Sequence, residues 1–383
     1  MKVLAVLVLL GAGAAPCLWD SDTLDTELRG LPDAFDLVTG RWHRHSDAYY
    51  RERVRRLGGK VDATLAELDD LAVAHEHLGE RAQAIEVMQQ KAALLAKHPD
   101  REHQYRYLAN LGTFYAHDGN YPAALVELTK AVALNPAAHF GRENFQIALI
   151  EYAAAAKAEP ALWARRSFLR HADYYLGCGF LRSIVEEEHD GNRELDWDRA
   201  YEAIGGMLRF GGREGPELYR SLGELFLAKE HLNLAWWAFR HAIERGHPAH
   251  EQLLGNLRYI EKHWQEAEAV HLVQATGVRA PTEVEYAGIR ASADRWLATF
   301  HELETAAIER GEDVSGDVAL RQLLAEADRR VPRPSTPRWW SGPELVVGGT
   351  AVILALWGFD KWRRRRRIAA SGHPAGTARL TQG

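Results

Sequence analysis

The chain has 383 residues and a formal net charge of −6 at pH 7, with 46% hydrophobic and 26% charged residues. These fractions are those of a folded protein and exclude wholesale disorder, and the length suits one large repeat domain or two ordinary ones. Alanine, leucine, glutamate and arginine dominate, and long strand-like alternation of apolar and polar residues is absent. The composition therefore predicts an all-α fold.

Residues 1–14 have the pattern of a secretory signal peptide. Lys2 supplies the positive start, Val3–Leu10 the apolar stretch and Ala12-Gly13-Ala14 the small-residue cleavage site. A buried N-terminal helix is the competing interpretation, but the order of these features favours export. Lipidation of Cys17 is a minor alternative, because Ala14 stands where a lipoprotein signal carries a leucine-like residue.

The next segment, residues 15–64, has a helical pattern without a repeat, and we expect it to cap the first repeat of the region that follows. Residues 65–275 contain a motif that recurs about every 34 residues, the period of helix-turn-helix repeats. Its clearest copy is residues 107–136, where small residues at Gly112 and Ala124 let two helices approach closely. A turn at Gly119-Asn120 joins them. Further copies lie at 68–88, 218–248 and, in degraded form, 253–270.

On these motifs the chain resembles the tetratricopeptide repeat family over residues 65–275. Its N-terminal stretch is similar to that of exported, membrane-anchored bacterial repeat proteins without an assigned activity. The resemblance implies an α-solenoid whose concave surface binds extended or helical peptides. The register of the copies places five polar side chains in that groove: Arg106, Thr113, Glu217, Arg220 and Glu224. This mixture departs from the lysine and asparagine pattern of a carboxylate clamp, so that peptide specificity does not carry over.

One repeat copy is predicted to be split by an insertion at residues 157–195. Phe145 lies one period of about 34 residues after Leu111, inside a sequence with a helical pattern. The second helix of this copy should then carry its small residue near Ala158, but the matching motif places that alanine at Ala200. Insertions in solenoids form loops on one face, often a binding face. An irregular packing element is the alternative.

The C-terminal quarter predicts a membrane anchor. Residues 276–330 form long amphipathic helices that close the far end of the repeats, and residues 331–343 are a proline-rich linker. Residues 344–360 form the transmembrane helix, with a basic tail at 361–383. A buried core helix is the competing interpretation. The aromatic and basic flanks favour the membrane: Trp339, Trp340, Trp357, Trp362, Arg363, Arg364, Arg365, Arg366 and Arg367.

The excess of arginine after the span predicts a cytoplasmic C-terminus and an extracytoplasmic bulk in a single-pass protein of the cytoplasmic membrane. That bulk is more acidic than the whole chain, because the basic block lies in the tail. An acidic domain repels phosphate backbones, so nucleic-acid binding is disfavoured.

No catalytic, cofactor or metal motif is present in the sequence. His43 and His45, like His75 and His77, are two residues apart and do not share a helix face. The two cysteines, Cys17 and Cys178, would both be in an oxidising compartment, where a disulfide between them is expected. A reactive Cys178 is the alternative.

These features predict a membrane-anchored extracytoplasmic scaffold or adaptor of the bacterial envelope, which binds a protein or peptide partner and needs no cofactor. The alternative is an extracytoplasmic enzyme, or an enzyme accessory subunit, with its site in the 157–195 insertion. A polar pocket enclosed by that insertion would favour the enzyme, and an insertion lying over the groove would favour the scaffold.

Overall fold

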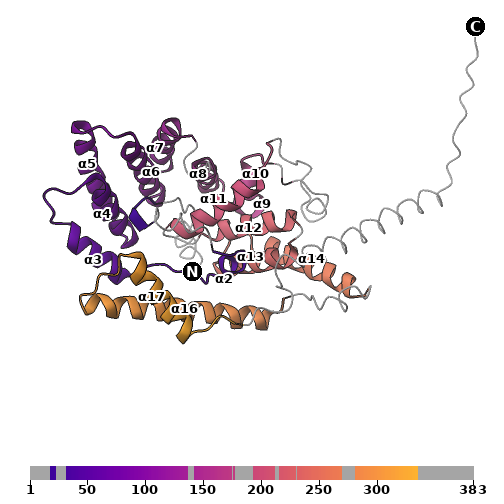
Figure 1. Ribbon diagram of the computed structural model, residues 1–383. Helices are drawn as coiled ribbons and strands as arrows, with labels where there is room; N and C mark the ends of the chain where they lie inside the picture. The colour runs from indigo at the N-terminus through magenta and orange to yellow at the C-terminus, as the bar shows by residue number, and fades with distance from the viewer. Residues whose placement is uncertain are drawn as a thin grey trace, which may run out of the picture. The chain divides into compact units, whose positions relative to one another are not determined.

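The fold is described from a computed structural model, which describes residues 18–22, 32–136, 142–174, 176, 193–211, 215–229, 231–269 and 281–334. Across these ranges every element is a helix, apart from one isolated parallel bridge between Tyr174 and Arg193 (Figure 1). The all-α prediction is confirmed for this part of the chain.

The bounds of the helices are α2 Ala34–Thr39, α3 Asp47–Leu57, α4 Leu65–His77, α5 Arg81–Lys97, α6 Arg101–His117, α7 Tyr121–Leu134, α8 Arg142–Ala158, α9 Leu162–Arg165, α10 Phe168–His171, α11 Trp197–Phe210, α12 Pro216–Ala228, α13 Leu232–Glu244, α14 His250–Ala269, α16 Glu283–Glu309 and α17 Asp317–Arg330. From α3 to α7 and from α11 to α14 the helices follow one another with short connections, which is typical of antiparallel neighbours.

Local sequence signals explain where several helices begin and end. The Thr64 side chain accepts a hydrogen bond from the backbone N–H of Glu67, whose carboxylate binds back, so α4 starts with a capping box. Thr282 starts α16 in the same way. Gly79 and Gly119, in the turns after α4 and α6, have φ values of 78° and 76°. Only glycine adopts this left-handed region without strain.

Helices α4 and α5, α6 and α7, and α12 and α13 form three closely packed hairpins. In the α6–α7 pair, a Cβ added to Gly112 would lie 2.7 Å from Cγ of Leu128 and 3.2 Å from the carbonyl oxygen of Ala124. In the α12–α13 pair, a Cβ on Gly223 would lie 2.6 Å from the ring of Phe239. The glycines therefore allow backbone approaches that no larger residue permits.

Helix α8 packs against α7 and α11, and it makes smaller contacts with the short helices α9 and α10 that follow it. The sequence placed the partner helix of this copy at Ala200, which lies buried in α11. Between them, the described residues form the short helices α9 and α10, and α10 contacts both α8 and α12. The first part of the 157–195 segment therefore lies on helices that flank it in the chain.

Helix α16 contacts α3 and α2, so the C-terminal helices pack on the N-terminal ones. Helix α16 also contacts α13 of the last clear hairpin, where Tyr286 meets the Trp237 ring and Arg290 pairs with Glu244, so the expected closure of the repeats by residues 276–330 stays a prediction. A shared core and a buried polar link join α16 to α3: Ala307 packs with Tyr49 and Tyr50. His45 Nδ1 lies 2.6 Å from the Glu304 carboxylate, which is fully buried.

Apart from the end of α14, the residues described above belong to one compact unit, formed by residues 1–261 and 281–334. A second unit comprises residues 262–280 and 335–383, of which the structure describes only the last turns of α14. Within the described ranges, no helix combines the length and apolar character needed to cross a membrane. The predicted signal peptide, membrane span and basic tail, at 1–14, 344–360 and 361–383, lie outside those ranges.

Candidate functional site

The three groove positions predicted on α12 are buried against the chain's own backbone. Arg220 is 1% exposed, and its Nη1 donates to the carbonyl oxygens of Trp163 at 2.6 Å and Arg166 at 3.0 Å. The backbone N–H of Phe168 donates to the Glu217 carboxylate at 2.7 Å. These positions do face polypeptide, but it is residues 163–168 of the same chain.

The charges on α12 compensate one another in this buried setting. Burial alone would lower the pKa of Arg220, but Glu217 and Glu224 on the same helix raise it above its usual value. Glu224 also accepts a hydrogen bond from Ser167 Oγ at 2.5 Å, and Glu217 lies 2.8 Å from Nε2 of buried His247. The arrangement holds a polypeptide segment in place through its carbonyl and amide groups.

The two groove positions predicted on α6 behave differently. Thr113 is fully buried, and its hydroxyl accepts a hydrogen bond from Gln146 Nε2 of α8 at 3.1 Å. It therefore lies in a helix–helix interface. Arg106 is half-buried and forms an ion pair with Glu102 one turn earlier on the same helix.

A second backbone segment, residues 18–22, lies against α3, α4 and α6. Trp19 is 2% exposed and makes two reciprocal hydrogen bonds with the side chain of Asn110 on α6. The Trp19 N–H donates to Asn110 Oδ1 at 2.7 Å, and Asn110 Nδ2 donates to the Trp19 carbonyl at 2.9 Å. The indole also meets the Tyr105 ring edge-on, at 6.0 Å between centroids.

The acidic residues of this segment converge on Arg53 of α3. Its Nη1 donates to Asp20 at 2.8 Å and its Nη2 to Asp22 at 2.6 Å, and the Tyr49 hydroxyl donates to Asp22 at 2.8 Å. Burial and the nearby Asp20 raise the pKa of Asp22, despite the opposing effect of Arg53. Charge-assisted contacts of this kind are the stronger hydrogen bonds in proteins.

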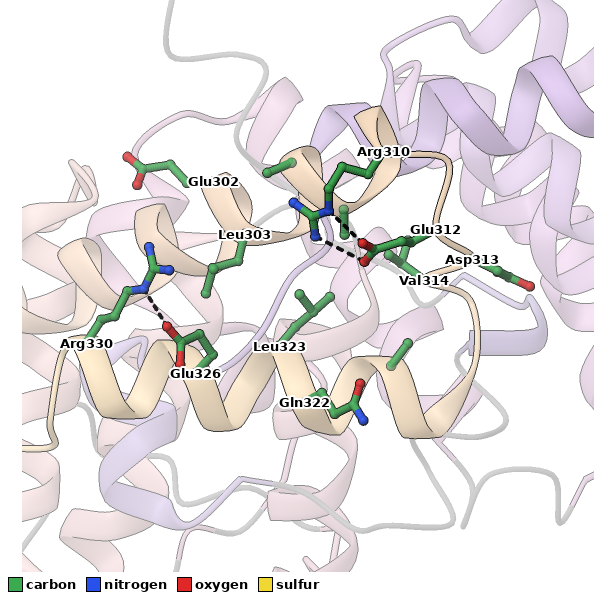
Figure 2. Close-up of a pocket in the computed structure, with 13 residues that line it drawn as sticks. Glu302, Leu303, Arg310, Glu312, Asp313, Val314, Gln322, Leu323, Glu326 and Arg330 are labelled. Carbon is green, nitrogen blue, oxygen red and sulfur yellow. Dashed lines mark hydrogen bonds and ion pairs between the residues drawn. The ribbon is translucent and has the colours of Figure 1, made fainter.

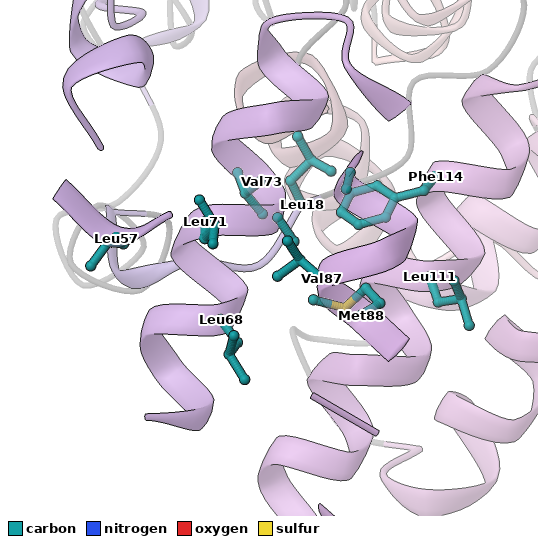
Figure 3. Close-up of a cluster of buried hydrophobic side chains, with 11 residues drawn as sticks. Leu18, Leu57, Leu68, Leu71, Val73, Val87, Met88, Leu111 and Phe114 are labelled. Atoms are coloured by element: carbon teal, nitrogen blue, oxygen red, sulfur yellow. The ribbon is translucent and has the colours of Figure 1, made fainter. Parts of the chain in front are cut away.

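The other residues of the segment complete its attachment. Ser21 donates its backbone N–H and its hydroxyl to the Asp70 carboxylate of α4, both at 2.8 Å. Leu18 is 1% exposed and lies in an apolar cluster with Val73, Val87 and Phe114, at the centre of the side chains drawn in Figure 3. Its N–H donates to the Phe210 carbonyl at 3.0 Å. Each described residue of the segment, from Leu18 to Asp22, is therefore in contact with other parts of the fold.

A buried ion pair fixes the orientation of the Asn110 side chain. The Asp69 carboxylate accepts hydrogen bonds from Asn110 Nδ2 at 3.2 Å and from Lys91 Nζ at 2.5 Å. Lys91 and Asp69 are 0% and 1% exposed. The amide of Asn110 is thus oriented by α4 and α5, which leaves its oxygen and one N–H directed at the Trp19 backbone.

Helices α16 and α17 enclose a shallow surface depression of about 480 Å³. Figure 2 shows Leu303 and Leu323 pointing into the space between the two helices. Ion pairs form its rim: Arg310 with Glu312 at 2.6 Å and Arg330 with Glu326 at 2.7 Å. The charges at the rim are satisfied within the depression itself, as in an ordinary contact between two helices.

Among the residues that the structure describes, no group of three or more His, Cys, Asp or Glu side chains is placed to hold a metal ion. His45 is stacked on Tyr49 and bound to Glu304, and His77 is stacked on Tyr50. Burial lowers the pKa of His77 to about 4. These histidines therefore take part in packing.

The other predicted site residues fall outside the described ranges. They are Cys17, Cys178 and the membrane flank formed by Trp339, Trp340, Trp357, Trp362, Arg363, Arg364, Arg365, Arg366 and Arg367. The disulfide and the anchor remain predictions from the sequence.

Asn110, Arg53 and Asp70 are binding residues that the sequence did not predict. One signal was available for Asn110, which is a polar residue inside the apolar run of α6 and lies one helical turn from Thr113. Arg53 and Asp70 sit in segments without a distinctive motif.

No protein-family model matches this chain, and comparisons with curated proteins and with solved structures also found no match. We therefore infer the function from the sequence and the geometry of the chain itself.

Proposed function

We propose that this protein is a membrane-anchored scaffold or adaptor of the bacterial envelope, whose extracytoplasmic helical-repeat domain binds another protein. The proposal combines a tetratricopeptide-like solenoid with a signal peptide, a single C-terminal membrane span and a cytoplasmic basic tail. Bulk charge supports a protein partner rather than nucleic acid, because the chain outside the tail is acidic.

The observation that carries the proposal is the repeated hairpin contact. Gly112 in α6 and Gly223 in α12 occupy the same position in their copies of the motif, and each sits where the following helix comes closest. Equivalent small residues at equivalent contacts are what a stacked array of helix-turn-helix units requires. Such arrays present extended surfaces to other proteins.

The described part of the 157–195 segment also favours a scaffold over an enzyme. Residues 163–168 lie on α12, where Arg220 and Glu217 bind their backbone and Glu224 accepts a hydrogen bond from the Ser167 hydroxyl. In catalytic sites, by contrast, charged groups with shifted pKa values typically face an open cleft. Here the charged groups serve packing.

The partner is to be identified by chemical crosslinking in intact membranes followed by pull-down of the full-length chain. We expect one or a few envelope proteins to be enriched over a control chain of the same topology. The topology is tested separately by adding protease outside the cytoplasmic membrane, which should digest residues 18–335 and leave a protected C-terminal fragment. A reporter fused at Gly383 that is active only outside that membrane would contradict the topology.

A further inference from the structure

Residues 18–22 are held by contacts that a separate peptide could make equally well. The backbone of Trp19 pairs with the Asn110 side chain, and the N–H of Ser21 binds Asp70. The receptor groups in these contacts are side chains of α4 and α6, and none depends on the covalent link between the segment and the helices. Main-chain hydrogen bonds of this kind supply affinity for extended peptides.

The side chains of the segment define what its binding site recognises; we call this site, formed by Arg53, Asp70, Tyr105 and Asn110, the cradle. Leu18 enters an apolar cluster, and Trp19 meets the edge of the Tyr105 ring. Asp20 and Asp22 both bind one guanidinium, that of Arg53. The cradle therefore reads an aliphatic residue, then an aromatic one, then acidic residues at the first and third positions after the aromatic.

The receptor side of these contacts is held in position by the fold. Asn110 is oriented by the buried Asp69–Lys91 pair, and the Arg53 guanidinium lies 4.8 Å from the centre of the Tyr49 ring. Groups that are already oriented lose little freedom on binding a ligand, which favours affinity. The cradle is thus suited to bind a peptide without rearranging.

We propose that this cradle, formed by Arg53, Asp70, Tyr105 and Asn110, is an exchangeable peptide-binding site whose built-in occupant is residues 18–22. A partner protein binds there by displacing this occupant with an extended segment of the same aliphatic–aromatic–acidic chemistry. The proposal names the ligand class of the scaffold function proposed above and rests on that function for its biological use. The binding itself is measurable without any partner.

A ligand in the same chain has an effective concentration of about a millimolar. A free peptide with the same contacts, added at about a micromolar, is therefore outcompeted by roughly a thousandfold in the wild-type chain. Weakening the occupant while leaving the cradle intact should uncover the site. The double substitution Asp20→Ala/Asp22→Ala does this, because it removes both ion pairs with Arg53 and keeps Leu18 and Trp19 packed.

The first experiment measures binding of a fluorescent, end-blocked peptide LWDSD to the full-length chain. We expect the Asp20→Ala/Asp22→Ala chain to bind it at least tenfold more tightly than the wild type. The matched control, Asp62→Ala/Asp198→Ala, removes two exposed aspartates and should bind like the wild type. The peptide LWNSN should bind the Asp20→Ala/Asp22→Ala chain at least tenfold more weakly than LWDSD. Equal binding by all three chains, or equal binding of both peptides, would overturn the proposal.

A second measurement needs no variant and remains decisive if the double substitution prevents folding. Hydrogen exchange of the wild-type chain is followed with and without excess LWDSD. We expect faster exchange at the amides of Trp19 and Ser21 when the peptide is present, with no change across residues 105–117. Unchanged exchange at residues 18–22 in saturating peptide would refute an exchangeable occupant.

The two proposals fail in different ways. If crosslinking recovers a partner but the peptide does not bind, the cradle is refuted and the scaffold function stands on another surface. If the peptide binds as expected but no partner is recovered, the cradle stands and the scaffold function loses its support.

Discussion

The close contact between α12 and α13 makes a sharp prediction for Gly223→Ala. A Cβ at this position would lie 2.6 Å from both Cδ1 and Cε1 of Phe239 and 3.0 Å from its Cγ. Carbon atoms in contact prefer about 3.5–4.0 Å, so the two helices must separate by roughly 1 Å or the ring must turn. Phe239 is fully buried, so its ring is surrounded by other parts of the fold.

The expected magnitude follows from two opposing effects. Overpacking of this kind costs about 1–3 kcal/mol. Replacing a helical glycine by alanine gains about 1 kcal/mol from helix propensity. Gly288 in α16 is exposed, and an added Cβ there meets no atom within 4 Å, so Gly288→Ala should show the gain alone. The two variants should therefore differ by about 1–3 kcal/mol in unfolding free energy.

The assay is urea unfolding of the full-length chain, followed by far-ultraviolet circular dichroism. We expect a lower urea midpoint for Gly223→Ala than for Gly288→Ala. If the dependence of unfolding free energy on urea concentration is unchanged, the difference reflects stability rather than a change in the unfolded state. If Gly223→Ala proves as stable as Gly288→Ala, the helices of this hairpin do not meet at the glycine. That result would also contradict the repeat register proposed for residues 218–248.

Three further predictions use other parts of the chain. Lys91→Met should cost about 3–5 kcal/mol, because it leaves buried Asp69 without its cation, and adding Asp69→Asn should recover most of the loss in urea unfolding. If Asp69→Asn restores none of the stability lost by Lys91→Met, the buried Lys91–Asp69 ion pair is contradicted. Burial and neighbouring Asp33 raise the pKa of Asp36 to about 7, against the effects of Arg333 and Arg41. The folded chain therefore keeps this proton while the unfolded chain loses it, so stability falls as pH rises between about 4 and 7, by up to about 1.4 kcal/mol per pH unit. Asp36→Asn should remove this contribution to the pH dependence of stability. If the stability of the Asp36→Asn chain and of the wild type changes with pH in parallel, the raised pKa of Asp36 is refuted. Mass spectrometry of unreduced peptides from exported protein should find Cys17 linked to Cys178, whereas two free thiols would end the disulfide hypothesis.

The sequence by itself predicted the helical class and the position of the hairpin turn at Gly119-Asn120, which lies between α6 and α7. It also predicted the small residues at the helix contact, Gly112 and Ala124, both of which are buried there. Such features are local, because hairpin partners are close in the chain and their spacing repeats. Periodicity and turn residues therefore carry the information.

Only the tertiary structure decided what occupies the inner surfaces of the fold. Trp19 and Asn110 are 91 residues apart, and His45 and Glu304 are 259 apart. Neither pair belongs to a repeating pattern, so no spacing in the sequence connects them. Residues 18–22 and 163–168 are bound in part through backbone groups, which every residue type carries. Their binding sites therefore depend on where the helices bring Asn110 and Arg220, and that placement arises only when the chain is folded.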